Sequence, residues 1–196
     1  LSNAEVRSLS EKKDVIKLSR NDLAYAISCR KTGATTVAAT MILAANANIK
    51  VFATGGVGGV HLDAEKTFDI SADLQELAQT PVTVISAGPK AILDLPKTLQ
   101  FLETLGVPVI TFGQDELPAF WSRSSGLRSP LRMNSAEEIA RSQLVREALS
   151  IPGGQLVANP IPAYAEIPFK EILPIIEKAH LEAKKENISE KNLTPF

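Results

Sequence analysis

Short runs of β-branched and other apolar residues alternate along the chain with longer segments whose apolar positions recur every three to four residues. The short runs predict strands at 14–18, 49–55, 82–86, 108–112 and 155–159. The longer segments predict helices at 21–29, 34–47, 71–78, 90–105, 135–149 and about 169–186. Apolar strands joined by helical crossovers are typical of a mostly parallel sheet covered on both faces. We therefore expect a three-layer α/β/α fold with a mostly parallel or mixed central sheet, in a single α/β domain spanning residues 1–196.

The composition excludes several classes of protein. Apolar residues make up 44% and charged residues 22% of the chain, as in soluble globular proteins. Lysine and arginine total 21 against 22 acidic residues, so no overall field favours nucleic acid or a membrane surface. No window approaches the roughly 20 apolar residues of a membrane span, and the first residues do not resemble a signal peptide. The lone cysteine, Cys29, excludes an internal disulfide and favours a reducing intracellular compartment, which we expect to be the cytoplasm.

The segment FATGGVGGVH, residues 52–61, follows a predicted strand, and open α/β sheets bind ligands at the carboxyl ends of their strands. Its glycines, Gly55, Gly56, Gly58 and Gly59, could let backbone N–H groups close on an anion. The segment lacks both the Gly-Lys-Ser/Thr of a P-loop and the G-x-G-x-x-G spacing of a dinucleotide-binding fold. An anion-binding loop and a flexible loop without a ligand remain equally open.

Two acidic residues, Asp69 and Asp73, lie four positions apart and would share a face if their segment were helical. Ser71 stands between them as a candidate N-cap. Two carboxylates and a hydroxyl could hold a hard divalent cation together with water. They could equally cap a helix and stabilise its first turn, and spacing alone favours this second interpretation. His61, upstream, could donate to a phosphate or could be an ordinary polar residue.

Lys90 follows a buried strand and a Ser-Ala-Gly turn, and the pattern predicts that it begins the next helix. A lysine there meets the positive end of the helix dipole, and the dipole and desolvation both lower its pKa. An amine with a lowered pKa is a candidate nucleophile for a carbonyl carbon. The alternative is a solvated lysine at the protein surface.

Two further segments could bind an anion. Lys17 and Arg20 follow the first predicted strand and could clamp a phosphate or carboxylate, or form a basic turn before the next helix. Residues 33–41, GATTVAATM, open a helix with free N–H groups and two hydroxyls. The same small residues also suit a helix packed tightly on a sheet.

Several blocks of sequence together resemble the pseudouridine-5′-phosphate glycosidase, or indigoidine synthase A-like, family. In chain order, these blocks are KLSRNDL, GATTVAATM, VFATGGVGGVH, TFDISADLQEL, SAGPKAILDLPKTLQFLETLGVPV, LPAFW and VANPIP. They run along essentially the whole chain. The resemblance is therefore more specific than any single loop.

The resemblance implies reversible cleavage of the C-glycosidic bond of pseudouridine 5′-phosphate to uracil and ribose 5-phosphate. It implies that Lys90 attacks C1′ of the ring-opened sugar and holds it as a Schiff base, with assistance from a divalent cation, typically Mn²⁺. Asp69 matches the metal-binding aspartate, which reverses the preference from spacing. The residues that match substrate-binding positions are Lys17, Val37, His61, Ser71, Ala72 and Asp73.

Members of this family are longer at both ends than the chain, so the resemblance implies the central part of a glycosidase. Their proton-donating glutamate lies upstream of these residues, and a substrate-contacting asparagine lies downstream. We expect a homotrimer, or association with the missing terminal segments, and some relatives carry a fused sugar-kinase domain. The alternative from another class is a phosphosugar-binding or scaffold fragment that lacks turnover.

Overall fold

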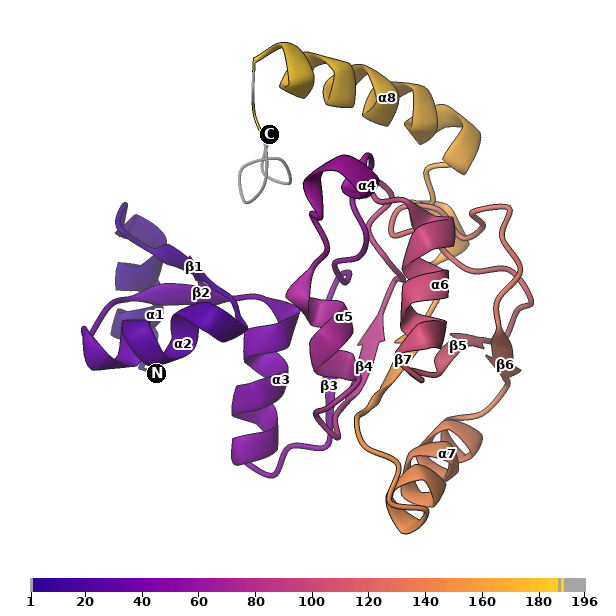
Figure 1. Ribbon diagram of the computed structural model, residues 1–196, viewed down its shortest axis with the longest axis horizontal. Coiled ribbons are helices and arrows are strands. Elements are labelled where there is room, and N and C mark those ends of the chain that lie inside the picture. Colours follow the sequence, from indigo (N-terminus) through magenta and orange to yellow (C-terminus); the bar gives the residue numbers. More distant parts are fainter. Residues whose placement is uncertain (1, 187, 189–196) are drawn as a thin grey trace.

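The computed structural model describes residues 2–186 and residue 188 (Figure 1). The first part of the chain forms α1 (Asn3–Glu11), β1 (Ile16–Leu18), the 3₁₀ helix η1 (Arg20–Asp22), α2 (Leu23–Ser28), β2 (Gly33–Thr35), α3 (Val37–Asn46) and β3 (Val51–Ala53). The middle part forms α4 (Ala64–Thr67), α5 (Ala72–Leu77), β4 (Thr83–Ser86), α6 (Leu95–Thr104) and β5 (Val109–Phe112). The last part forms β6 (Leu131–Met133), α7 (Ala136–Ala148), β7 (Gln155–Ala158), the 3₁₀ helix η2 (Ala163–Ala165) and α8 (Phe169–Lys185).

The central sheet has the strand order β3-β4-β7-β5-β6, and its pairings in the described residues are parallel. Alternate residues of each strand face opposite sides of such a sheet. Val84, Val109 and Leu156 pack on one side with residues of α3, α5 and α6. Ile110 and Val157 pack on the other side with Ile139 of α7. The fold is therefore three-layer α/β/α, as the sequence pattern predicts.

The first predicted strand does not join this sheet. β1 pairs with β2 in a separate two-stranded parallel sheet, which lies with α1 and α2 beyond α3 in Figure 1. Leu18 and Leu23 form a small core there with Ala26 and with Ala39 of α3. The prediction of a helix from residue 34 was wrong at its start, because Gly33–Thr35 pair with β1 before the helix begins.

The helix predicted at 90–105 begins five residues later, at Leu95. Asp94 is its N-cap and accepts a hydrogen bond from the backbone N–H of Lys97. The apolar spacing of residues 91–95 imitates a helix, but Leu93 forms an antiparallel bridge with His61 instead. Lys90 therefore lies in a loop, and the prediction that it meets the end of a helix dipole was wrong.

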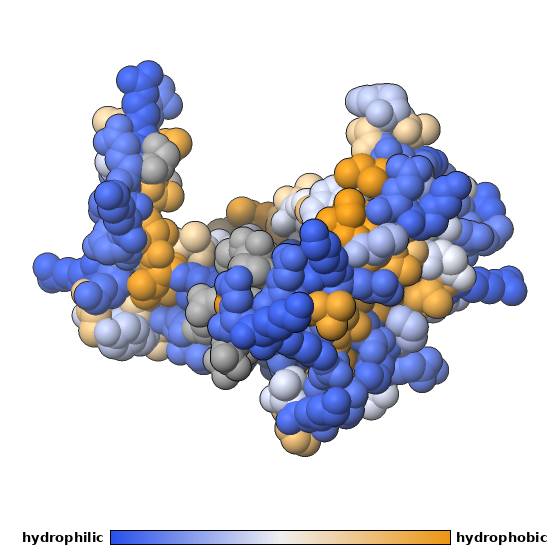
Figure 2. Space-filling view, turned by 90° about the horizontal axis from the view of Figure 1, so that it is seen from above, coloured by the Kyte–Doolittle hydropathy of each residue, from blue (hydrophilic) through white to orange (hydrophobic). Residues whose placement is uncertain are grey.

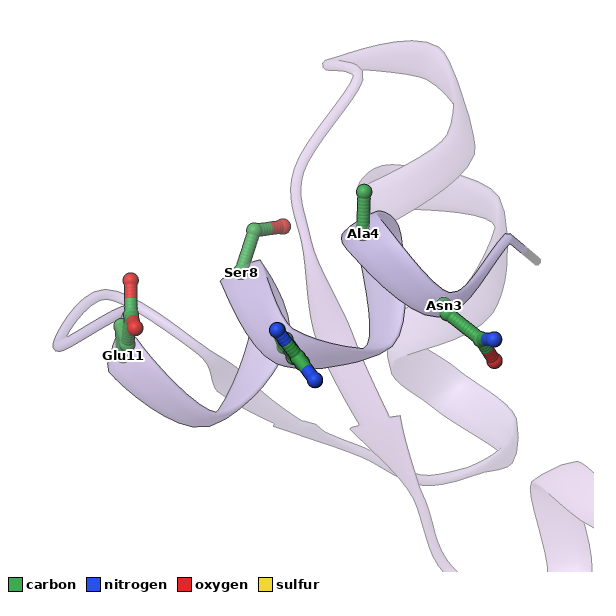
Figure 3. Close-up of a pocket in the computed structure, with 5 residues that line it drawn as sticks. Asn3, Ala4, Ser8 and Glu11 are labelled. Carbon is green, nitrogen blue, oxygen red and sulfur yellow. The ribbon is translucent and has the colours of Figure 1, made fainter.

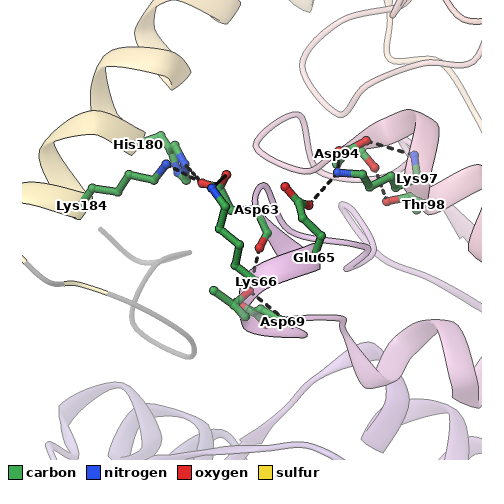
Figure 4. Close-up of polar contacts among 10 residues, drawn as sticks. Asp63, Glu65, Lys66, Asp69, Asp94, Lys97, Thr98, His180 and Lys184 are labelled. Carbon is green, nitrogen blue, oxygen red and sulfur yellow. Dashed lines mark hydrogen bonds and ion pairs between the residues drawn. The ribbon is translucent and has the colours of Figure 1, made fainter.

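Helix α8 crosses the end of the molecule and packs on the loop that follows Lys90. Its Ile172 and Ile176 contact the cluster that contains Ala91 and Leu93. Farther along α8, Lys184 and His180 both contact Asp63 beside α4 (Figure 4). The Lys184 ammonium holds the pKa of Asp63 at about 2, well below its usual range.

The surface is largely hydrophilic in the view of Figure 2, with hydrophobic residues in separate patches. None of the helices in the described part of the chain is both long and apolar enough to cross a membrane. A hollow of about 430 Å³ runs along α1 (Figure 3). Its lining residues, Asn3, Ala4, Arg7, Ser8 and Glu11, all belong to that one helix, and it includes no predicted site residue.

Candidate active site

A cavity of about 430 Å³ lies beside the carboxyl ends of β3 and β4, where parallel sheets bind ligands. It is lined by Lys17, Ala34, Thr35, Thr36, Val37, Thr54, Gly55, Gly56, Gly58, His61, Ser71, Asp73, Lys90, Leu93 and Phe120. Six of the eight predicted site residues are in this set. The other two, Asp69 and Ala72, do not line the cavity. The structure thus brings together predicted site residues that are up to 73 positions apart in the chain (Lys17 and Lys90).

Backbone hydrogen bonds on both sides fix the position of Lys90. Its N–H donates to the carbonyl of Val57 at 3.1 Å, and its carbonyl accepts from the N–H of Leu93 at 3.1 Å. Burial lowers the pKa of the half-buried amine, the carboxylate of Asp73 raises it, and the positive charge of Lys17 lowers it again. The predicted direction of the pKa shift is confirmed, but burial rather than a helix dipole is the main cause.

The turn before Lys90 requires glycine. Gly88 has φ +96°, and a Cβ there would lie 2.3 Å from the carbonyl oxygen of Pro118. A side chain would therefore be strained by its own backbone and would also strike a neighbouring peptide. The Gly88 N–H donates to Ser86 Oγ at 3.2 Å, which fixes the path from β4 into the cavity wall.

Asp73 holds two walls of the cavity together. It is 6% exposed, and its Oδ1 accepts from the N–H of Ala38 in α3 at 2.8 Å. Its Oδ2 accepts from the N–H of Gly58 in the glycine-rich loop at 2.9 Å. Ser71 caps α5 by accepting from the N–H of Asp73. The capping interpretation of Ser71 is confirmed, whereas Asp73 and Asp69 do not share a helix, because Asp69 lies outside α5.

The glycine-rich loop is packed closely against its neighbours. A Cβ at Gly58 would lie 2.2 Å from Ser71 Oγ, and one at Gly59 would lie 2.5 Å from Thr98 Oγ1. At Gly56 a Cβ would lie 2.6 Å from the ring of Phe120. These contacts explain the glycines by close approach of the chain, and they argue against the interpretation as a flexible loop.

His61 and Asp69 lie side by side at the edge of the cavity. The N–H of His61 donates to the carbonyl of Asp69 at 3.0 Å, and Nδ1 of the ring lies 3.9 Å from Asp69 Oδ2. Burial lowers the pKa of His61, the charge of Asp69 raises it, and the charges of Lys90, Lys17 and His180 lower it further. In the described part of the chain, Nδ1 is buried without a hydrogen-bond partner.

The Asp69 carboxylate and the His61 ring suit a cation that keeps most of its water ligands. They do not form a site in which protein groups supply all the metal ligands. Among the described residues, no three His, Cys, Asp or Glu side chains come together to hold a metal ion. A small divalent ion often keeps most of its waters and takes only one or two carboxylates from a protein. The carboxylate of Asp69, with the unpartnered Nδ1 of His61 beside it, suits that mode of binding.

Comparison with known proteins identifies the family. The family model described as "Indigoidine synthase A like protein" matches residues 1–196. The chain belongs to the indigoidine synthase A-like family. This family member is 63% identical over its full length to a pseudouridine-5′-phosphate glycosidase of Jannaschia sp. (strain CCS1) and covers 65% of that protein. It is 65% identical, over 93% of its length, to the protein of the same name from Paracoccus denitrificans (strain Pd 1222), of which it covers 60%.

Two solved structures share the fold. The chain superposes on the prealnumycin C-glycosynthase AlnA, determined in complex with ribulose 5-phosphate, with a TM-score of 0.92 and 34% identity. It superposes on an indigoidine synthase A-like protein from Thermotoga maritima with a TM-score of 0.90 and 34% identity. In both cases it is covered completely and spans 64% of the other chain. This indigoidine synthase A-like chain thus spans about two thirds of the length of its relatives.

Sequence reasoning missed part of the cavity of this indigoidine synthase A-like chain. Thr54 follows β3 directly, and its position after a strand could have marked it. Phe120 follows β5 by eight residues within LPAFW. That block was used only for the family resemblance, because an aromatic residue in a loop carries no local signal of a binding role.

Proposed function

We propose that this chain is the central part of a pseudouridine-5′-phosphate glycosidase that interconverts pseudouridine 5′-phosphate with uracil and ribose 5-phosphate. The observation that carries the proposal is Lys90, a half-buried amine with a lowered pKa inside a cavity that also contains Lys17. The names of the curated relatives give the substrate class. The homotrimer and the fused sugar-kinase domain remain predictions from the family resemblance.

Lys90 would act as the nucleophile. The neutral amine adds to the aldehyde carbon C1′ of the open-chain sugar, a C–N bond forms, and the aldehyde oxygen leaves as water to give an imine. The exposed ammonium of Lys17, which lines the same cavity, would bind the 5′-phosphate as a point charge. Hydroxyls in the cavity wall, among them Ser71 and Thr36, offer hydrogen bonds to the sugar. Val37, His61, Ala72 and Asp73 are assigned to the substrate site from the family resemblance.

Borohydride trapping tests the proposal. We expect the chain, incubated with ribose 5-phosphate and borohydride, to gain one covalent sugar phosphate per molecule, measured as intact mass and mapped to the peptide that contains Lys90. Ribose without phosphate should react much less, because it lacks the group that Lys17 binds. Reversible binding of ribose 5-phosphate without any adduct would instead indicate the phosphosugar-binding fragment.

The pH dependence of trapping follows from the same amine. Only the neutral form attacks, so the rate should rise with pH, and burial should place the midpoint below the value near 10.4 of an exposed lysine. A positive neighbour disfavours the ammonium, so Lys17→Met should raise the pKa of Lys90 and move the midpoint to higher pH. A midpoint at or above about 10.4 in the unsubstituted chain would contradict this account.

We also propose that Asp69 holds a divalent cation, Mn²⁺ by family resemblance, largely through water. When bound, such an ion supplies positive charge that polarises an oxygen ligand. At about 100 times its dissociation constant, Mn²⁺ should stabilise the chain by about 2.7 kcal/mol and so raise the melting temperature by roughly 5–10 °C. Asp69→Asn should abolish most of this shift. The control Asp115→Asn, at an exposed ion pair with Arg132, should retain it, and equal shifts in both variants would contradict the assignment.

A further inference from the structure

The aromatic ring of Phe120 lies in the cavity wall, and the backbone of this residue is strained. Its φ is +55°, in the left-handed region that bulky side chains rarely adopt. Phe68 shares this conformation, but it ends α4 and is 84% exposed. Phe120 is instead partly buried and lines the cavity. Strained residues that face a cavity are found disproportionately at binding sites.

Contacts on several sides keep the ring in place. The N–H of Phe120 donates to the carbonyl of Ala87 at 2.9 Å, in the same segment that leads to Lys90. Trp121 meets the ring edge to face, with the centroids 4.8 Å apart and the planes at 77°. The backbones of Ala119 and Ser122 exchange two hydrogen bonds across the pair, at 2.9 and 3.1 Å. These contacts hold the strained residue in one position.

The glycine-rich loop makes room for the same ring. A Cβ at Gly56 would lie 2.6 Å from Cδ2 and 2.8 Å from Cε2 of Phe120, whereas one at Gly55 would lie 3.5 Å from Cε2. The ring edge therefore rests on the backbone at Gly56. Any side chain at position 56 would push the ring aside.

The chemistry of the remaining wall suggests what the ring contacts. Eight of the residues that line the cavity have charged or hydrogen-bonding side chains: Lys17, Thr35, Thr36, Thr54, His61, Ser71, Asp73 and Lys90. Such groups suit a sugar and its phosphate. Among the described residues that line the cavity, Phe120 has the only apolar aromatic side chain, because the other ring, the imidazole of His61, is polar and lies beside Asp69. A planar pyrimidine gains most from a flat apolar partner.

We propose that Phe120 is the stacking wall for the base, and so a specificity-determining residue for the uracil half of the substrate. This assignment rests on the proposed function, because it takes the base from the C-glycoside. It divides the cavity into a polar part for ribose 5-phosphate and an aromatic wall for the planar ring. The position of Phe120, bonded through Ala87 to the segment of Lys90, keeps the two parts in a fixed relation.

Equilibrium titration with two ligands tests the assignment. Lys90→Met serves as the background, so that both pseudouridine 5′-phosphate and ribose 5-phosphate bind without covalent chemistry. Adding Phe120→Leu should weaken binding of pseudouridine 5′-phosphate by about 10- to 100-fold and of ribose 5-phosphate by less than about twofold. Phe120→Tyr keeps the aromatic face and should restore most of the affinity. Gly56→Ala, which displaces the ring without removing it, should likewise weaken binding of pseudouridine 5′-phosphate more than binding of ribose 5-phosphate.

The outcomes separate this assignment from the proposed function. Equal losses for the two ligands, or no loss for pseudouridine 5′-phosphate, would overturn the role of Phe120 while leaving trapping at Lys90 intact. Absence of a ribose 5-phosphate adduct on the unsubstituted chain would overturn the proposed function, and the assignment with it. Melting temperatures of all variants show whether a loss of affinity reflects unfolding. If Phe120→Leu unfolds, Gly56→Ala and Phe120→Tyr decide the outcome alone.

Discussion

Lys90→Met will abolish trapping of ribose 5-phosphate, lowering the yield of covalent adduct at least about 100-fold, because the other lysine that lines the cavity, Lys17, is assigned to the phosphate and not to C1′. Methionine has nearly the same length and removes only the amine. The half-buried position should then become slightly more stable, since burial disfavours the charged form of the lysine that it replaces. Intact-mass spectrometry after borohydride treatment measures the adduct, and thermal unfolding measures stability.

Lys17→Met provides the matched control for this result. It removes an equally long cationic side chain from the same cavity but leaves the nucleophile. The adduct should still form at saturating ribose 5-phosphate, with a lower apparent affinity for the sugar phosphate. An adduct that persists in Lys90→Met and is lost in Lys17→Met would show that Lys17, and not Lys90, is the nucleophile.

Asp73→Asn will lower the free energy of unfolding by about 3 kcal/mol, because charge-assisted hydrogen bonds inside a protein are costly to lose. The carboxylate offers one oxygen to Ala38 and the other to Gly58. An amide has one oxygen and one NH₂ group, so one of the two backbone N–H groups would face another donor. Urea denaturation measures the difference, provided that the slope of the transition is unchanged.

Asp94→Asn tests whether the loss is specific to this arrangement. Asp94 also accepts a backbone hydrogen bond, from the N–H of Lys97, but asparagine is an equally good N-cap. Asp94→Asn should lower the free energy of unfolding by only about 0.5 kcal/mol, mostly because the ion pair with Lys97 is lost. If Asp73→Asn costs no more than this, the carboxylate does not hold the two walls together.

The elements that sequence patterns predicted best are those with a local cause. The strands at 82–86, 108–112 and 155–159 match β4, β5 and β7 to within one residue at each end, because short β-branched runs bounded by polar or turn residues have few alternatives. Ser135 and Glu138 form the capping box that their spacing predicts. In each case the signal and the structure involve the same few residues.

The features that were missed depend on distant parts of the chain. β2 is a three-residue strand that exists because β1 pairs with it, and its composition is that of a helix start. Asp73 bonds to residues 35 and 15 positions away, which spacing along the chain cannot indicate. Residues 91–95 have helical spacing, but Leu93 forms a bridge with His61. The direction of the pKa shift at Lys90 was predicted for a reason that was only half right, since burial lowers it without a helix dipole.

Lys17 and Lys90 lie beside two different hydrophobic cores, which are joined through α3. Lys17 lies on β1, whose neighbours form the small core around Leu18 and Leu23, whereas Lys90 follows a strand of the central sheet. A sugar phosphate bound by both lysines would therefore connect the small core beside β1 to the central sheet. The distance between the phosphate and C1′ of the sugar would set the spacing of the two lysines. Binding of a sugar phosphate that is one carbon shorter or longer would therefore require the protein to deform, in addition to losing contacts.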